Sequence, residues 1–255
     1  MAHPMLSTDH QQIATICPAS VLNKVSIMNK ITRSILEDLA TVRESLLSLS
    51  DDIWLSIDHN DTGEMEAGCK FKGVYNSKMV AFDALATEIS EVVQKFTNID
   101  LDSSESQSDA DVTENDRLVR ELKLDQPHKV TEDFTYKRPH GFILKGTAIT
   151  GVITWKRLYT RFCETLNRLD SDVFSQLPDN EDYVSTHGNH AFATTRDGFI
   201  EPISVGDVFT EAHMSANSFR NSMRKLMRTF GIDDGDFDIF LREDRDANRV
   251  RQDIS

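Results

Sequence analysis

The chain has 255 residues, with 42 acidic and 28 basic side chains and a formal net charge of −14. This charge disfavours non-specific attraction to nucleic acids and anionic membranes, although a local basic face remains compatible with it. No run of about 18 apolar residues is present, so no membrane-spanning helix is expected. The cysteines are few and widely spaced, which is typical of free thiols in a reducing cytoplasm.

A long helix is predicted near the N-terminus, after a polar stretch over residues 1–19 that we expect to be a disordered leader. Apolar residues recur in alternating steps of four and three from Val21 to Ile53. Such a heptad rhythm predicts a helix that packs against other helices. The candidate partner-binding residues lie on this rhythm: Ile35, Leu39, Val42, Leu46, Leu49 and Ile53.

A second helix is predicted from about Tyr75 to Phe96, folded back on the first as an antiparallel hairpin over residues 20–97. It would span roughly 33 Å at ~1.5 Å per residue, against roughly 50 Å for the first helix. Part of the apolar surface of the first helix would then stay uncovered. We therefore expect a partner that is either a second copy of the chain or another helical protein, with a homo-oligomer favoured.

The connection between these helices contains Asp58-His-Asn60-Asp-Thr62-Gly63, which resembles the start of an EF-hand calcium loop. That loop requires a bidentate Glu at its twelfth position, where this chain has Cys69. We therefore favour a turn-rich loop with Asp and Asn caps, and keep a cation in loop 58–69 as the alternative.

The second half of the chain predicts a separate α+β domain with a small antiparallel sheet over residues 118–241. An acidic, serine-rich linker over residues 98–117 precedes it, and a charged tail over residues 242–255 follows it. A hairpin is expected from Phe142–Leu144 and Ala148–Ile153, with Lys145-Gly146 at its tight turn. One helix is expected after the N-cap Thr154. Another is expected from Ser215 to Phe230, with Gly231 as its stop. The expected fold class is thus α+β, with a coiled-coil-like hairpin in front.

Residues 129–241 resemble the C-terminal modules of uncharacterised bacterial proteins associated with restriction and phage defence. The resemblance is carried by Gly151-Val-Ile-Thr-Trp-Lys-Arg-Leu-Tyr and by Met214-Ser-Ala-Asn-Ser-Phe-Arg-Asn-Ser-Met-Arg-Lys-Leu. It implies a role in phage defence and brings no catalytic motif.

A basic face is predicted on the helix from Ser215 to Phe230. Arg, Lys and Asn side chains on an exposed helix are the groups that contact phosphates and base edges. A solvated face on a core helix, with basic residues favoured near the C-terminal end, explains the same pattern. The candidate nucleic-acid-binding residues are Arg220, Asn221, Arg224, Lys225 and Arg228.

Three histidines offer imidazole ligands for a metal: His187, His190 and His213, with Cys163 or an acidic group as a fourth. Structural zinc sites usually show tighter paired spacing, and a His-x-x-His in a Gly/Asn loop is more typical of a polar loop. No cofactor is therefore expected.

The sequence lacks a phosphate-binding Gly loop, a nucleophile elbow and a zinc-protease motif. We expect a non-enzymatic cytoplasmic adaptor or assembly protein. Its helices would associate with themselves or with a partner, and its C-terminal domain would recognise a ligand or a partner. The alternatives are a DNA-binding regulator that acts through the basic helix, and a metal-dependent enzyme that uses the histidines.

Overall fold

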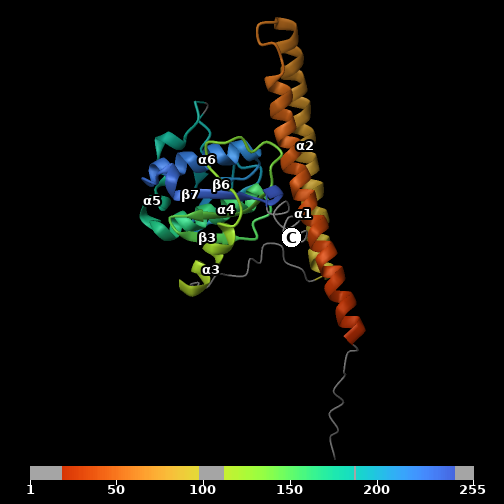
Figure 1. Ribbon diagram of the computed structural model, residues 1–255. Coiled ribbons are helices and arrows are strands. Elements are labelled where there is room, and N and C mark those ends of the chain that lie inside the picture. The colour runs from red at the N-terminus through yellow and green to blue at the C-terminus, as the bar shows by residue number, and fades with distance from the viewer. Residues whose placement is uncertain (1–18, 98–111, 187, 245–255) are drawn as a thin grey trace, which may run out of the picture.

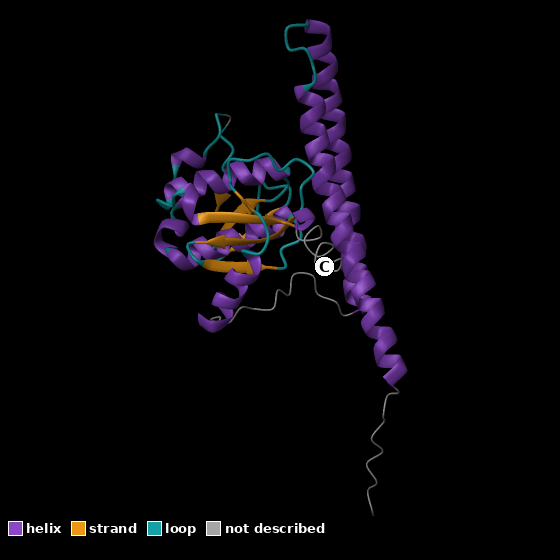
Figure 2. Cartoon of the chain, in the orientation of Figure 1, coloured by secondary structure: helices purple, strands orange, loops and turns teal. Residues whose placement is uncertain are grey.

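A long helical hairpin lies against an α+β body (Figures 1 and 2). The computed structural model of the chain describes residues 19–97, 112–186 and 188–244, and describes the side chains of the first helix from Met28 onward. This architecture confirms the predicted α+β class. The expected leader falls almost wholly outside the described residues, and so does most of the expected charged tail.

The hairpin is formed by α1 (Ala19–Leu55) and α2 (Thr62–Thr97), which have 37 and 36 residues. The predicted hairpin is confirmed, but the expectation of a short second helix is wrong. Tyr75 donates a hydrogen bond to the carbonyl of Leu46 at 2.8 Å, and Lys72 donates one to Ser50 at 2.8 Å. In this register α2 runs along nearly all of α1, so any uncovered apolar surface lies on the side of the hairpin, not beyond its end.

The connection is shorter than predicted because α2 begins inside the expected loop. Asp61 caps it: one carboxylate oxygen accepts from the backbone N–H of Gly63 at 2.7 Å and of Glu64 at 3.0 Å. Gly68 costs helix propensity, but a Cβ there would overlap Cδ1 of Ile57, so close packing favours glycine. Since residues 62–69 are helical, the calcium-loop alternative is wrong.

The contact seam of α1 differs from the predicted heptad positions. Met28, Ile35, Val42 and Leu49 were expected to face another helix, yet they are 40–61% exposed. Buried positions instead include Leu36, Arg43 and Ser50. The reason is that α1 is covered on two sides, by α2 and by the body, and this rotates its buried surface away from the predicted stripe.

Two small antiparallel sheets form the body, where a single one was predicted. Lys145 and Gly146 form the predicted tight turn between β2 and β3, with φ of 47° and 81°. The first sheet has the order β1-β7-β2-β3 and consists of β1 (Pro127–His128), β2 (Pro139–Leu144), β3 (Thr147–Thr150) and β7 (Phe237–Leu241). The second has the order β4-β6-β5 and consists of β4 (Phe192–Ala193), β5 (Pro202–Val205) and β6 (Val208–Glu211).

The helices of the body follow the predicted caps. Thr154 caps α4 by accepting from the backbone N–H of Arg157 at 3.2 Å, and Gly231, with φ of 60°, follows the end of α6. The first of these body helices, α3, begins at Val112, inside the expected linker 98–117. The predicted end of the linker was therefore placed too late. The four helices are α3 (Val112–Leu122), α4 (Trp155–Leu169), α5 (Ser171–Ser175) and α6 (Ala216–Thr229), and short 3₁₀ turns lie at Leu177–Asp179, Glu181–Tyr183 and Asp234–Asp236.

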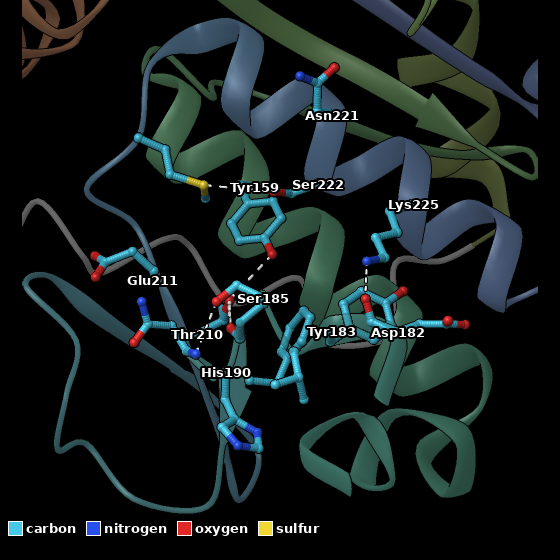
Figure 3. A pocket seen from close by; sticks show the side chains of 15 residues that line it. Tyr159, Asp182, Tyr183, Ser185, His190, Thr210, Glu211, Asn221, Ser222 and Lys225 are labelled. Atoms are coloured by element: carbon cyan, nitrogen blue, oxygen red, sulfur yellow. Dashed lines mark hydrogen bonds between the residues drawn. The ribbon is translucent and has the colours of Figure 1, made fainter. Parts of the chain in front are cut away.

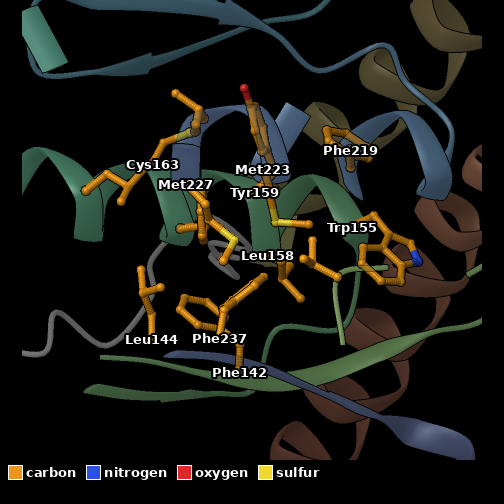
Figure 4. Close-up of a cluster of buried hydrophobic side chains, with 14 of the residues drawn as sticks. Phe142, Leu144, Trp155, Leu158, Tyr159, Cys163, Phe219, Met223, Met227 and Phe237 are labelled. Carbon is orange, nitrogen blue, oxygen red and sulfur yellow. The ribbon is translucent and has the colours of Figure 1, made fainter. Parts of the chain in front are cut away.

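The main core lies between the first sheet and helices α4 and α6 (Figure 4). Phe142, Phe162 and Phe237 form its aromatic centre, with ring centroids 5.0–6.5 Å apart. On the other face of the sheet, α3 buries Leu122 against Phe240 in a smaller cluster. Residues of β2 and β7 are therefore buried on both faces, and these two strands form the centre of the body.

Candidate functional site

A cluster of charged residues joins the hairpin to the body, and Arg43 of α1 is at its centre. The Arg43 side chain is 8% exposed, and its Nε donates to Oδ1 of Asp83 on α2 at 2.8 Å. Its Nη2 pairs with Glu201 and contacts the carbonyl of Ala212 at 3.5 Å. His213 completes the cluster, with its Nδ1 2.6 Å from Oδ2 of Asp83. One buried cation therefore links both helices of the hairpin to two segments of the body.

Glu44, the next residue, caps a helix of the body. Its carboxylate accepts from the backbone N–H of Trp155 at 3.1 Å and of Lys156 at 2.9 Å. These are the first residues of α4, where unpaired N–H groups and the helix dipole favour an anion. Glu44 is buried, and this burial outweighs the two amide hydrogen bonds and raises its pKa to about 7.

The contacts of Arg43, Glu44, Asp83, Glu201 and His213, which we call the joint, were not predicted. The heptad pattern placed Arg43 and Glu44 outside the apolar stripe, where charged residues usually face solvent. Burial favours a higher pKa for both Glu44 and Asp83, but the net shifts of these two carboxylates are opposite. Burial would raise the pKa of Asp83, but His213 and Arg43 outweigh it and lower that pKa. In the joint, the charged form of Asp83 is therefore stabilised, whereas the charged form of Glu44 is destabilised.

The joint determines which face of the hairpin stays open. Arg43 points to α2, and Glu44, one helical step of about 100° further, points to the body. Val42, one step back, therefore points away from the body. The same holds for α2: Ala86 and Thr87 line a cleft of about 580 Å³ between hairpin and body, whereas Leu85 does not.

Large apolar side chains follow this open side on both helices. The α2 row follows the three- and four-residue spacing of one helix face, and the α1 row follows it to Ile35 and then continues at seven-residue steps. The row on α2 is 45–88% exposed. The line along which α1 and α2 touch is a common reference for both helices. Because the two helices are antiparallel, side chains rotated from this line in the same sense along each helix lie on the same face of the hairpin. We call the two rows together the outer face: Met28, Ile31, Ile35, Val42 and Leu49 on α1, and Leu85, Ile89, Val92 and Phe96 on α2.

The predicted partner-binding residues divide between this face and the seam. Ile35, Val42 and Leu49 belong to the outer face. The other three, Leu39, Leu46 and Ile53, are half-buried beside α2. The heptad rhythm thus combined positions of two adjacent faces, and their role in partner binding stays a prediction.

A second candidate site is a cavity of about 420 Å³ beside α6 (Figure 3). The buried Tyr159 hydroxyl lies 3.4 Å from Oγ1 of Thr210, which itself donates to a backbone carbonyl at 2.9 Å. Lys225 lies at the mouth, 4.7 Å above the ring of Tyr183 and hydrogen-bonded to the carbonyl of Asp182. The cavity offers apolar walls, hydroxyl groups and one cation to a small ligand.

The five predicted nucleic-acid-binding residues lie on α6, and three of them, Arg220, Arg224 and Lys225, make contacts within the fold. Arg220 donates to the carbonyl of Glu132 at 2.6 Å, and Lys225 donates to the carbonyl of Asp182. Arg224 lies 4.0 Å from Asp234. Asn221 and Arg228 are exposed. DNA contact through this helix stays an alternative prediction, with part of its face occupied by structural contacts.

The predicted histidine metal site is not assembled among the described residues. His190 is exposed and lines the cavity, whereas His213 lies in the joint, and His187 lies outside the described residues. The Cys163 thiol is fully buried, which raises its pKa. Oxygen and nitrogen atoms of Asp83, Glu201 and His213 do lie within 4.8 Å of one another. Arg43 already supplies the positive charge there, so this group forms an ion-pair cluster.

No helix in the described part of the chain is long and apolar enough to cross a membrane. Searches against protein-family models, curated proteins and solved structures found no match to this chain.

Proposed function

We propose that this chain is a non-enzymatic assembly protein of the cytoplasm, in which the hairpin carries association and the body carries recognition. The outer face is the observation that supports this proposal. The exposed apolar side chains of the outer face, between Met28 and Leu49 on α1 and between Leu85 and Phe96 on α2, would be stabilised by removal from water, and contiguous exposed apolar patches mark interaction sites.

The joint gives the assembly its geometry. Because Arg43 and Glu44 fix the body against the inner side of the hairpin, a helical partner on the outer face meets no obstruction from the described part of the body. The body then points away from the partner. Its cavity beside α6 would be presented outward to a ligand or a second protein.

The resemblance of residues 129–241 to restriction- and phage-defence-associated modules suggests a bacterial defence system as the setting. In such a setting, the hairpin would gather copies or components, and the body would contact the molecule to be recognised. This assignment rests on the resemblance alone.

The proposal is tested by photo-crosslinking of the full chain in the cells that produce it. A benzoylphenylalanine replaces Ile35 or Ile89 on the outer face. Ile200, which is 56% exposed on the body, serves as the matched control. We expect a covalent protein adduct from positions 35 and 89 and none from position 200. An absent adduct, or equal adducts from all three positions, would overturn the proposed role of the hairpin.

A further inference from the structure

We propose that the partner on the outer face is a second copy of this chain, packed outer face to outer face around a two-fold axis that runs along the hairpin. This inference rests on the proposed function, since it names the helical partner. The product is a four-helix bundle with one body on each side.

The first argument is the area of the outer face. A fully buried Leu, Ile, Val or Met side chain removes roughly 100 Å² of apolar surface from water. The nine outer-face side chains are 40–88% exposed and therefore present on the order of 500 Å² of apolar surface, the larger part of the roughly 800 Å² that one partner contributes to a stable interface. Two copies of this face match each other in size.

The second argument is charge. Helical spacing places two acidic and two basic residues on or beside the two rows, Asp38 on α1 and Lys78, Glu88 and Lys95 on α2, and all four are exposed. The described outer face therefore carries no net charge, although the chain carries −14. Copies that repel each other elsewhere meet no net repulsion here.

The third argument is orientation. An axis along the hairpin places α1 of one copy over α2 of the other, so that neighbouring helices run antiparallel, as in up-and-down bundles. Rotation about this axis keeps each residue at its own height along the hairpin, so Asp38 lies near the height of residues 83–88 of the partner copy, roughly 10 Å along the axis from its Lys78. Rows of apolar residues also face each other, with Ile35 close to the height of Ile89. Since each joint lies on the opposite side, the two bodies do not clash.

Sedimentation velocity of the purified full chain tests this inference. At tens of micromolar, we expect twice the mass of the 28.9 kDa chain. Ile35→Glu or Ile89→Glu should raise the dissociation constant at least a hundredfold and give a monomer. Ile200→Glu should remain a dimer, because it adds the same charge outside the face. Circular dichroism confirms that each variant is folded.

Disulfide formation between differently tagged copies gives a second measurement. Copies carrying Ile35→Cys and Ile89→Cys, each with Cys17→Ser and Cys69→Ser, should cross-link to one another when mixed and oxidised. A wild-type monomer at tens of micromolar, with adducts to another protein in the cell, would overturn the second copy and leave the proposed function standing. A dimer unaffected by the outer-face glutamates would overturn both.

Discussion

The Glu44 carboxylate of the hairpin accepts the backbone N–H of Trp155 in the body at 3.1 Å, across a buried interface. A side chain from one structural unit thus completes the first turn of a helix in another. Glu44 is buried at this contact, so its charged carboxylate loses its hydration. The attachment of the hairpin to the body therefore depends on the protonation of Glu44.

Stability is expected to depend on pH through Glu44. Burial raises its pKa from 4.5 to about 7, so its contribution is complete below pH 4.5 and is lost as the pH rises through 7. Between pH 5 and 8, we expect wild type to lose up to about 3 kcal/mol relative to Glu44→Gln, which does not titrate. Urea unfolding of both proteins at the two pH values measures this difference. Parallel pH profiles would contradict it.

Removal of the Arg43 guanidinium should destabilise the protein far more than removal of a surface arginine. Arg43→Met leaves Asp83 with only His213 and Glu201 with only Lys156 beside it, so the loss should lie toward the lower end of the about 3–5 kcal/mol that breaking a buried pair typically costs. The matched control is Arg117→Met, whose ion pairs to Glu114 and Glu121 are exposed and screened by solvent, so its loss should be much smaller. Chemical denaturation of the two variants gives the comparison, and equal losses would show that the buried charges of the joint do not depend on Arg43.

Two glycine substitutions should change stability in opposite directions. At Gly141, a Cβ would lie 2.7 Å from the carbonyl oxygen of Ile149 and 2.8 Å from Leu122, so Gly141→Ala should cost about 1–3 kcal/mol. At Gly73, inside α2, a Cβ would meet nothing within 4 Å, so Gly73→Ala should stabilise the helix by about 0.5–1 kcal/mol. Thermal unfolding measures both, and a tolerated Gly141→Ala would mean that the β2–β3–α3 packing is looser than described.

Local signals in the sequence predicted much of the fold. Thr154 and Gly231 marked helix ends correctly, and Lys145-Gly146 marked a tight turn, because caps and turns depend on neighbouring residues. The start of α2 was missed because glycine signals a loop unless close packing, as at Gly68 against Ile57, favours it. Burial by distant segments has no local signature.

The candidate site was predicted only in part for the same reason. A heptad rhythm shows which residues avoid water, but it does not assign them to a particular neighbour. The rhythm therefore merged the outer face with the α1–α2 seam. The joint was not predicted because Arg43 and Glu44 are residue types that usually lie on a solvated helix face. Only the folded chain brings Asp83, Glu201 and the N-terminus of α4 next to them.

The protection of a cysteine on the outer face tests the central claim most directly. In a Cys17→Ser, Cys69→Ser background, Ile35→Cys and Ile200→Cys place comparably exposed thiols on the outer face and on the body, while Cys163 is buried. If the outer face is covered in solution, a maleimide at tens of micromolar protein should modify the thiol at position 35 at least tenfold more slowly than the thiol at position 200, and adding Ile89→Glu should remove the protection. Equal rates at the two positions would mean that the outer face is open to water and would contradict the account.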